Sequence, residues 1–125
     1  MRLLLDSHVL LWWDADLSKL SNAQRDAISD PTNEVFVSAA TAWELGIKRS
    51  AGKLTLTDSI QVLVQRFGFV ELPITMKHGE LAASLPLHHK DPFDRMLVAQ
   101  ANAERMTLVT ADGRLAVYSV NLLLG

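Results

Sequence analysis

Short apolar runs alternate with amphipathic segments along the whole chain. The apolar runs predict strands at 2–6, 34–38, 69–72, 107–110 and 119–123. Between them, apolar residues at helical spacing predict helices at 7–13, 18–28, 39–48, 57–66, 77–84, 91–104 and 114–117. Because strands and helices alternate from end to end, the pattern predicts an α/β fold, with a central, mostly parallel sheet covered by helices on both faces.

The predicted helix at 91–104 begins with unusually clear signals. Asp91 is suited to the N-cap, Pro92 to the first helical position, and Asp94 falls at the third. The residues that follow are apolar on most sides, so we expect the helix to be well buried. A carboxylate at its start is therefore held rigidly beside backbone N–H groups. Such a carboxylate serves either a well-made cap or a metal site, and a metal site needs further acids elsewhere.

Length and composition indicate the number of domains and exclude several kinds of chemistry. A chain of 125 residues fits one domain, 1–125, and a hydrophobic content of 49% suits a sheet covered on both faces. The absence of cysteine excludes disulfides, thiolate chemistry and cysteine-based zinc sites. No apolar run approaches the length of a membrane span, so we expect a soluble, cytoplasmic protein without a membrane partner. A net charge of −2 is not typical of a nucleic-acid binder, so RNA binding would need a local basic patch or metal ions.

Four acids occupy positions that can converge in such a fold. Asp6 follows the first strand, Asp112 follows the fourth, Asp94 begins a helix, and Glu44 lies early in another helix. Carboxyl ends of parallel strands meet at one edge of the sheet. Clustered carboxylates repel one another unless a cation neutralises them, and oxygen-only ligands favour Mg²⁺ or Mn²⁺. Such ions activate water and stabilise charge on a phosphodiester. A single acid would be weak evidence for a metal site, because the chain contains 14 acidic residues.

In combination and order, these motifs resemble those of a known family. The motifs are Asp6 after an N-terminal strand, the Ala42–Leu45 run AWEL with Lys48, the Asp91–Arg95 run DPFDR, and the Thr110–Asp112 run TAD. They resemble the PIN-domain ribonucleases, and most closely the VapC-type toxins of bacterial toxin–antitoxin pairs. The resemblance implies a three-layer PIN domain and a Mg²⁺- or Mn²⁺-dependent endoribonuclease. It also implies a homodimer and a VapB-type antitoxin whose tail covers the active site.

The resemblance also implies roles for particular residues. Asp6, Glu44 and Asp94 match the metal-binding acids of the family, and Asp112 matches a more variable fourth acid. The supporting residues are the hydroxyls Ser7 and Thr110, together with Lys48 and Asp91, of which Asp91 matches no core position and is expected to be a helix cap. On this hypothesis, one or two ions held by Asp6, Asp94 and Asp112 orient a hydroxide for in-line attack. Glu44 binds a second ion or orients the water, and the products carry a 5′-phosphate and a 3′-hydroxyl.

Other residues have a plain interpretation beside a functional one. His88 and His89 lie next to the expected site and either contact phosphate or belong to an ordinary polar loop. Arg95 is expected to pair with a neighbouring acid. The three tryptophans are expected in or near the core, except that one of Trp12 and Trp13 could line a partner groove, because neighbours on a helix cannot both face the same core.

The main alternative function is a non-catalytic, Mg²⁺-binding α/β module, either receiver-like or partner-binding. A receiver domain would have paired acids after the first strand, whereas Asp6 stands alone. A haloacid-dehalogenase-type phosphatase would have a second Asp where this chain has His8, and a nucleotide-binding fold would have a Gly-rich loop there. A PIN-like protein that has lost its activity is a third alternative.

Overall fold

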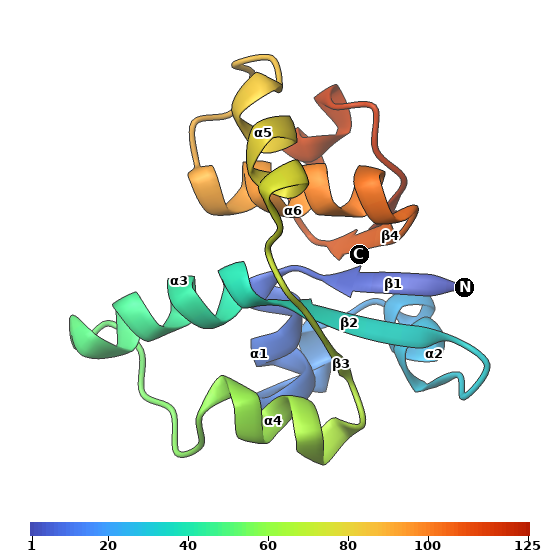
Figure 1. Ribbon diagram of the computed structural model, residues 1–125. Helices are drawn as coiled ribbons and strands as arrows, with labels where there is room; N and C mark the ends of the chain where they lie inside the picture. The colour runs from blue at the N-terminus through green and yellow to red at the C-terminus, as the bar shows by residue number, and fades with distance from the viewer.

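A computed structural model describes all residues, 1–125, and its centre is a five-stranded parallel sheet (Figure 1). The strands are β1 (Arg2–Leu5), β2 (Glu34–Ser38), β3 (Val70–Leu72), β4 (Thr107–Thr110) and β5 (Leu122–Leu124). Their order across the sheet is β3-β2-β1-β4-β5, and every neighbouring pair is parallel. The predicted fold class is therefore confirmed.

Helices cover both faces of the sheet. In Figure 1, α5 (Met76–Ser84) and α6 (Pro92–Glu104) lie above it, and α1 (Ser7–Ala15), α2 (Asn22–Ser29) and α4 (Ile60–Phe67) lie below. The long helix α3 (Ala39–Ser50) extends from the carboxyl end of β2, and two 3₁₀ helices, η1 (Leu17–Lys19) and η2 (Gly113–Val117), complete the elements. None of the helices is both long and apolar enough to cross a membrane.

The alternating side chains of β1 explain the three layers. Leu3 and Leu5 point to a core shared with α1, α2 and α4, whereas Leu4 points to a core shared with α6. All three leucines are fully buried, as expected for a central strand covered on both faces. The run of three consecutive leucines is thus a consequence of two-sided burial.

The strand order places a switch point between β1 and β4. From β1 the chain proceeds outward through β2 and β3, then returns to the other side of β1 for β4 and β5. In open parallel sheets, the crevice outside the carboxyl ends of strands at such a reversal is where ligands bind. Asp6 follows β1 and Asp112 follows β4, so the fold brings both residues to this crevice.

Three predicted elements were wrong in their bounds. The helix predicted at 57–66 begins at Ile60, because the Ser59 hydroxyl caps it by accepting from the main-chain N of Val62. The single helix predicted at 18–28 is divided into η1 and α2, because Ser21 starts a new helix. Its hydroxyl accepts a hydrogen bond from the main-chain N of Gln24, and the Gln24 side chain accepts one in return from the main-chain N of Ser21. The last strand begins at Leu122 and ends at Leu124, later than the 119–123 predicted.

The expectation that Trp43 lies in or near the core was wrong. Its side chain is not in or near the core, because the residue is 64% exposed on α3, where its ring forms a T-shaped pair with Phe93. Trp12 and Trp13 are half-buried, and both pack against the core that α1 shares with Leu3 and Leu5, so the expectation that they could not face the same core was wrong. Trp12 also lines the pocket described below, and Trp13 packs against Phe69.

Candidate metal centre

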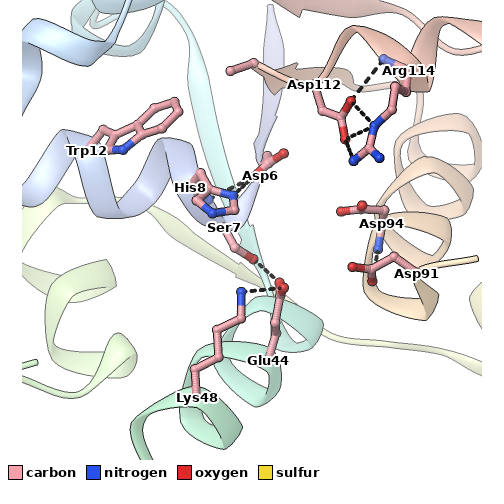
Figure 2. Close-up of a pocket in the computed structure, with 11 residues that line it drawn as sticks. Asp6, Ser7, His8, Trp12, Glu44, Lys48, Asp91, Asp94, Asp112 and Arg114 are labelled. Carbon is pink, nitrogen blue, oxygen red and sulfur yellow. Dashed lines mark hydrogen bonds and ion pairs between the residues drawn. The ribbon is translucent and has the colours of Figure 1, made fainter. Parts of the chain in front are cut away.

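A pocket of about 440 Å³ opens at the switch point between β1 and β4 (Figure 2). The sequence-predicted acids Asp6, Glu44, Asp94 and Asp112 all line it, and so do the supporting residues Ser7, Lys48 and Asp91. Thr110 contributes from behind Asp6 through a hydrogen bond. The structure therefore brings together residues that are more than one hundred positions apart in the sequence.

Asp6 is fixed by two hydrogen bonds at the start of α1. Its Oδ1 accepts from the main-chain N of His8 at 2.8 Å, as an N-cap, and its Oδ2 accepts from the Thr110 hydroxyl at 2.6 Å. The Thr110 hydroxyl oxygen in turn accepts from the main-chain N of Asp112 at 3.0 Å. Thr110 thus ties the end of β4 to the end of β1 and orients a nearly buried carboxylate.

Glu44 has partners from two helices. Ser7, on α1, donates to its Oε1 at 2.6 Å, and Lys48, one turn further along α3, donates to its Oε2 at 3.2 Å. The i,i+4 spacing of Glu44 and Lys48 predicted that the two side chains share one face of the helix. Lys48 balances the charge of a carboxylate that is only 9% exposed.

Asp94 lies in an environment that raises its pKa. Burial raises its pKa, and the nearby carboxylates of Asp91 and Asp6 raise it further, while a hydrogen bond with His89 partly offsets both effects. Asp91 accepts hydrogen bonds from the main-chain N atoms of Phe93 and Asp94, at 2.8 and 3.3 Å, so its predicted role as the cap of α6 is confirmed.

Asp112 has an opposite electrostatic environment. The Arg114 guanidinium approaches both of its oxygens, with Nε 2.9 Å from Oδ1 and Nη2 2.8 Å from Oδ2. These hydrogen bonds hold the pKa of Asp112 below its usual range. Arg114 is largely exposed, so solvent screens this ion pair.

The pocket as a whole is deficient in positive charge. Five carboxylates line it (Asp6, Glu44, Asp91, Asp94 and Asp112) against two cations (Lys48 and Arg114), which leaves three uncompensated negative charges. A divalent cation fits this imbalance, and the oxygen donors are those that hard divalent ions prefer.

Sequence reasoning did not identify the roles of Arg114, His89 and Arg95. Arg114 and His89 contact Asp112 and Asp94 directly, although only the place of His89 beside the DPFDR run hinted at this. The expectation that Arg95 pairs with an acid was wrong. Its buried guanidinium instead donates to the main-chain O atoms of Ala82, Leu85 and Pro86, each at 2.9 Å.

Comparison with known proteins agrees with this geometry. The family model described as "PIN domain" matches residues 3–121. The chain is 33% identical to Ribonuclease VapC22 of Mycobacterium tuberculosis over 115 residues, which cover 90% of this chain and 88% of the relative.

Several solved structures with the same fold come from toxin–antitoxin systems. A chain of VapBC2 from Rickettsia felis, solved with a promoter DNA fragment, superposes with a TM-score of 0.74 at 17% identity, covering 100% of this chain and 99% of that one. A chain of FitAcB from Neisseria gonorrhoeae superposes with a TM-score of 0.60 at 21% identity, covering 97% and 96%. The chain belongs to the PIN-domain family and, within it, to the homologues of the VapC ribonucleases. The resemblance found in the sequence is therefore confirmed.

Proposed function

We propose that this protein is a metal-dependent endoribonuclease that acts as the toxin of a toxin–antitoxin pair, with residues 1–125 forming a single PIN domain. The observation that carries the proposal is the switch-point pocket, where five carboxylates face only two cations. The similarity to Ribonuclease VapC22 supports RNA as the substrate. Since cellular RNA is the substrate, the proposed place of action is the cytoplasm.

The proposed cofactor is Mg²⁺, with Mn²⁺ as a substitute. Asp6, Asp94 and Asp112 would hold the ion, and Glu44 would hold a second ion or orient the attacking water. When bound, such an ion neutralises charge on the scissile phosphodiester and lowers the pKa of water at the site. The acid-rich pocket supports this assignment, because the carboxylates repel one another without a cation.

The remaining residues position these acids. Thr110 and the main-chain N of His8 orient Asp6, Ser7 and Lys48 orient Glu44, and Asp91 fixes the helix start that carries Asp94. Rigid acids hold the water in line with the leaving 3′ oxygen without a cost of reorganisation during the reaction. Cleavage in this geometry leaves a 5′-phosphate and a 3′-hydroxyl.

The proposed protein partners are a VapB-type antitoxin, which covers the pocket, and a second copy of the chain. The structural relatives from toxin–antitoxin complexes support the antitoxin. Exposed apolar residues on α3, Trp43 and Ile47, offer a surface for contacts between proteins.

Cleavage of a mixed pool of structured RNAs tests the proposal. Purified protein with Mg²⁺ or Mn²⁺ is expected to cut, whereas the Asp6→Asn variant and an EDTA control are not. Asp26→Asn, a charge-matched change at an exposed position on α2, is expected to cut like the unmodified protein. Cutting by Asp6→Asn at the unmodified rate would contradict the site assignment. No cutting by folded, antitoxin-free protein at any metal concentration would favour the non-catalytic metal-binding module.

A further inference from the structure

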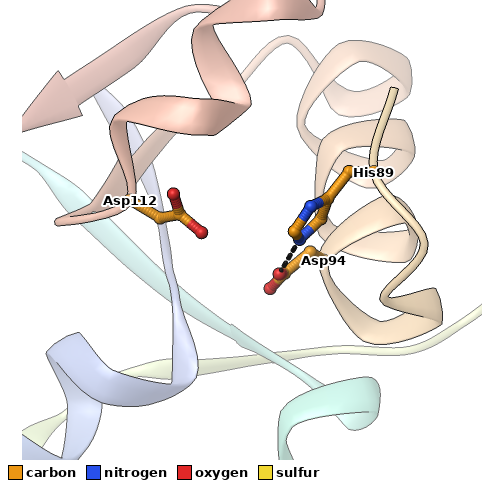
Figure 3. A group of neighbouring side chains, drawn as sticks. All are labelled: His89, Asp94 and Asp112. Atoms are coloured by element: carbon orange, nitrogen blue, oxygen red, sulfur yellow. Dashed lines mark hydrogen bonds and ion pairs between the residues drawn. The ribbon is translucent and has the colours of Figure 1, made fainter. Parts of the chain in front are cut away.

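His89 lies next to two acids of the pocket, Asp94 and Asp112 (Figure 3). Its Nε2 is 2.7 Å from Asp94 Oδ2, and one ligand atom from each of His89, Asp94 and Asp112 lies within 4.8 Å of the other two. His89 and Asp94 are mostly shielded from solvent, with side chains 14% and 20% exposed. These three residues form a group whose donor atoms are close enough to hold a metal ion.

The loop that carries His89 is held in place by two buried residues. The Tyr118 hydroxyl oxygen accepts from the main-chain N of His89 at 3.0 Å, and the same hydroxyl donates to the main-chain O of Pro86 at 3.1 Å. Arg95 fastens the preceding residues through the main-chain O atoms of Leu85 and Pro86. The imidazole is therefore positioned in advance, as a metal ligand requires.

The neighbouring His88 has a different environment, although it belongs to the same loop. It is exposed, and its ring meets the Tyr118 ring edge-on, with centroids 5.6 Å apart. Neither histidine is among the residues that line the pocket, but only His89 brings a ring nitrogen to the group that it forms with Asp94 and Asp112. The two adjacent histidines thus provide a matched pair, one with a donor atom beside the acids and one without.

The chemistry of His89 suits a metal ligand in this pocket. A neutral imidazole adds a donor without adding a negative charge to acids that already repel one another. The 2.7 Å between His89 Nε2 and Asp94 Oδ2 would allow both atoms to bind one ion. For Nε2 to do so, the ring proton would have to be on Nδ1, and Nε2 would then not donate to Asp94.

We propose that His89 is a metal ligand beside Asp94 and Asp112, and that its nitrogen raises the affinity of this site for Mn²⁺ relative to its affinity for Mg²⁺. Imidazole nitrogen is a better donor to transition ions than to Mg²⁺, which prefers oxygen throughout. The inference rests on the proposed function for the presence of a divalent ion in this pocket. It goes further by assigning the ion a nitrogen ligand and a preference.

Electron paramagnetic resonance of bound Mn²⁺ tests the assignment on the full chain. Spin-echo spectra of the unmodified protein are expected to show nitrogen hyperfine coupling from imidazole. The coupling should persist in His88→Ala and vanish in His89→Ala, with His89→Gln as a second variant that keeps the size and polarity of the side chain. Titrations should show Mn²⁺ affinity falling at least about tenfold in both His89 variants, with a smaller change for Mg²⁺.

Each outcome separates this inference from the proposed function. Bound Mn²⁺ without nitrogen coupling, or equal losses of Mn²⁺ and Mg²⁺ affinity, would overturn the role of His89 as a ligand. RNA cleavage would then still depend on the carboxylates, and the proposed function would stand. Failure of the unmodified protein to bind any divalent ion would overturn both.

Discussion

Two walls of the pocket each carry a shielded carboxylate, and the chain stabilises the negative charge of these two carboxylates in different ways (Figure 2). On the Glu44 wall, formed by Ser7, Glu44 and Lys48, a buried carboxylate has a hydroxyl on one oxygen and an ammonium on the other. On the Asp94 wall, formed by Asp91 and Asp94, a half-buried carboxylate faces another acid, and its side-chain partner is the imidazole of His89. One wall is balanced within the chain, and the other is not.

This difference indicates where a divalent ion is needed most. Burial and neighbouring acids raise the pKa of Asp94, which means that its ionised form is poorly stabilised by the chain itself. Lys48 already supplies a positive charge at Glu44. The Asp94 wall is therefore where an added cation gains the most, and the Glu44 wall contributes orientation more than affinity.

The largest expected effect comes from removing the charge on each wall in turn. Asp94→Asn should reduce RNA cleavage at least about 1,000-fold, which corresponds to about 4 kcal/mol of barrier. Glu44→Gln should reduce it about 10- to 100-fold, as expected for a residue that orients ligands and water. Single-turnover cleavage rates measure both effects, and circular dichroism checks that both variants fold. Equal losses for the two variants would show that the walls do not differ in function.

A second test removes the positive charge of Lys48, so that the Glu44 wall is no longer balanced within the chain. Lys48→Met keeps most of the stem of the side chain but removes the charge that Glu44 now shares. The variant should bind one more Mn²⁺ ion per chain than the unmodified protein, because Glu44 then needs an outside cation. Counting bound ions by paramagnetic titration measures this. An exposed change on the same helix, Arg49→Met, serves as the control and should leave the number unchanged.

The sequence predicted those parts of the pocket that depend on the periodicity of strands and helices. Strand and helix patterns, together with the β1 and β4 ends, were enough to bring Asp6 and Asp112 to one crevice, because parallel topology requires it. The i,i+4 spacing was enough to pair Glu44 with Lys48. These relations depend on backbone periodicity, which the sequence displays directly.

Contacts across loops could not be predicted in the same way. The position of His89 depends on Tyr118, which is 29 residues further along the chain, and on Arg95, whose contacts are main-chain carbonyls rather than acids. Similarly, the exposure of Trp43 reflects the extension of α3 away from the sheet, whereas composition alone favours burial of tryptophan. Such features follow from packing between elements and produce no regular spacing of residues in the sequence.

Thermal stability without metal should distinguish Asp94 from Asp112. The pKa of Asp94 is raised on folding, so its contribution to stability is full below the unfolded-state pKa and is lost as the pH rises through the folded-state value. Asp94→Asn should therefore raise the melting temperature by a few degrees in EDTA at pH about 7, with the gain disappearing near pH 4.

Asp112→Asn should behave in the opposite sense. Hydrogen bonds from Arg114 lower the pKa of Asp112, so its contribution is present above the unfolded-state pKa and is lost as the pH falls through the folded-state value. Its replacement should give no gain in melting temperature at neutral pH. Scanning calorimetry from acid to neutral pH measures both variants. A stabilised Asp112→Asn, or an Asp94→Asn variant without any gain, would contradict the electrostatic contrast.

The smallest expected effect concerns the support of the unbalanced wall. Tyr118→Phe keeps the buried ring but removes the hydroxyl that accepts from the main-chain N of His89 and donates to Pro86. The loss should destabilise the fold by about 1 kcal/mol and weaken Mn²⁺ binding only a few-fold, since the loop is still fastened by Arg95. Its effect on Mn²⁺ affinity should be smaller than that of His89→Ala and should be absent in the His89→Ala background, because the hydroxyl acts on the ion through His89. A double-mutant cycle measures this dependence, and additive losses would show that Tyr118 supports the pocket by another route.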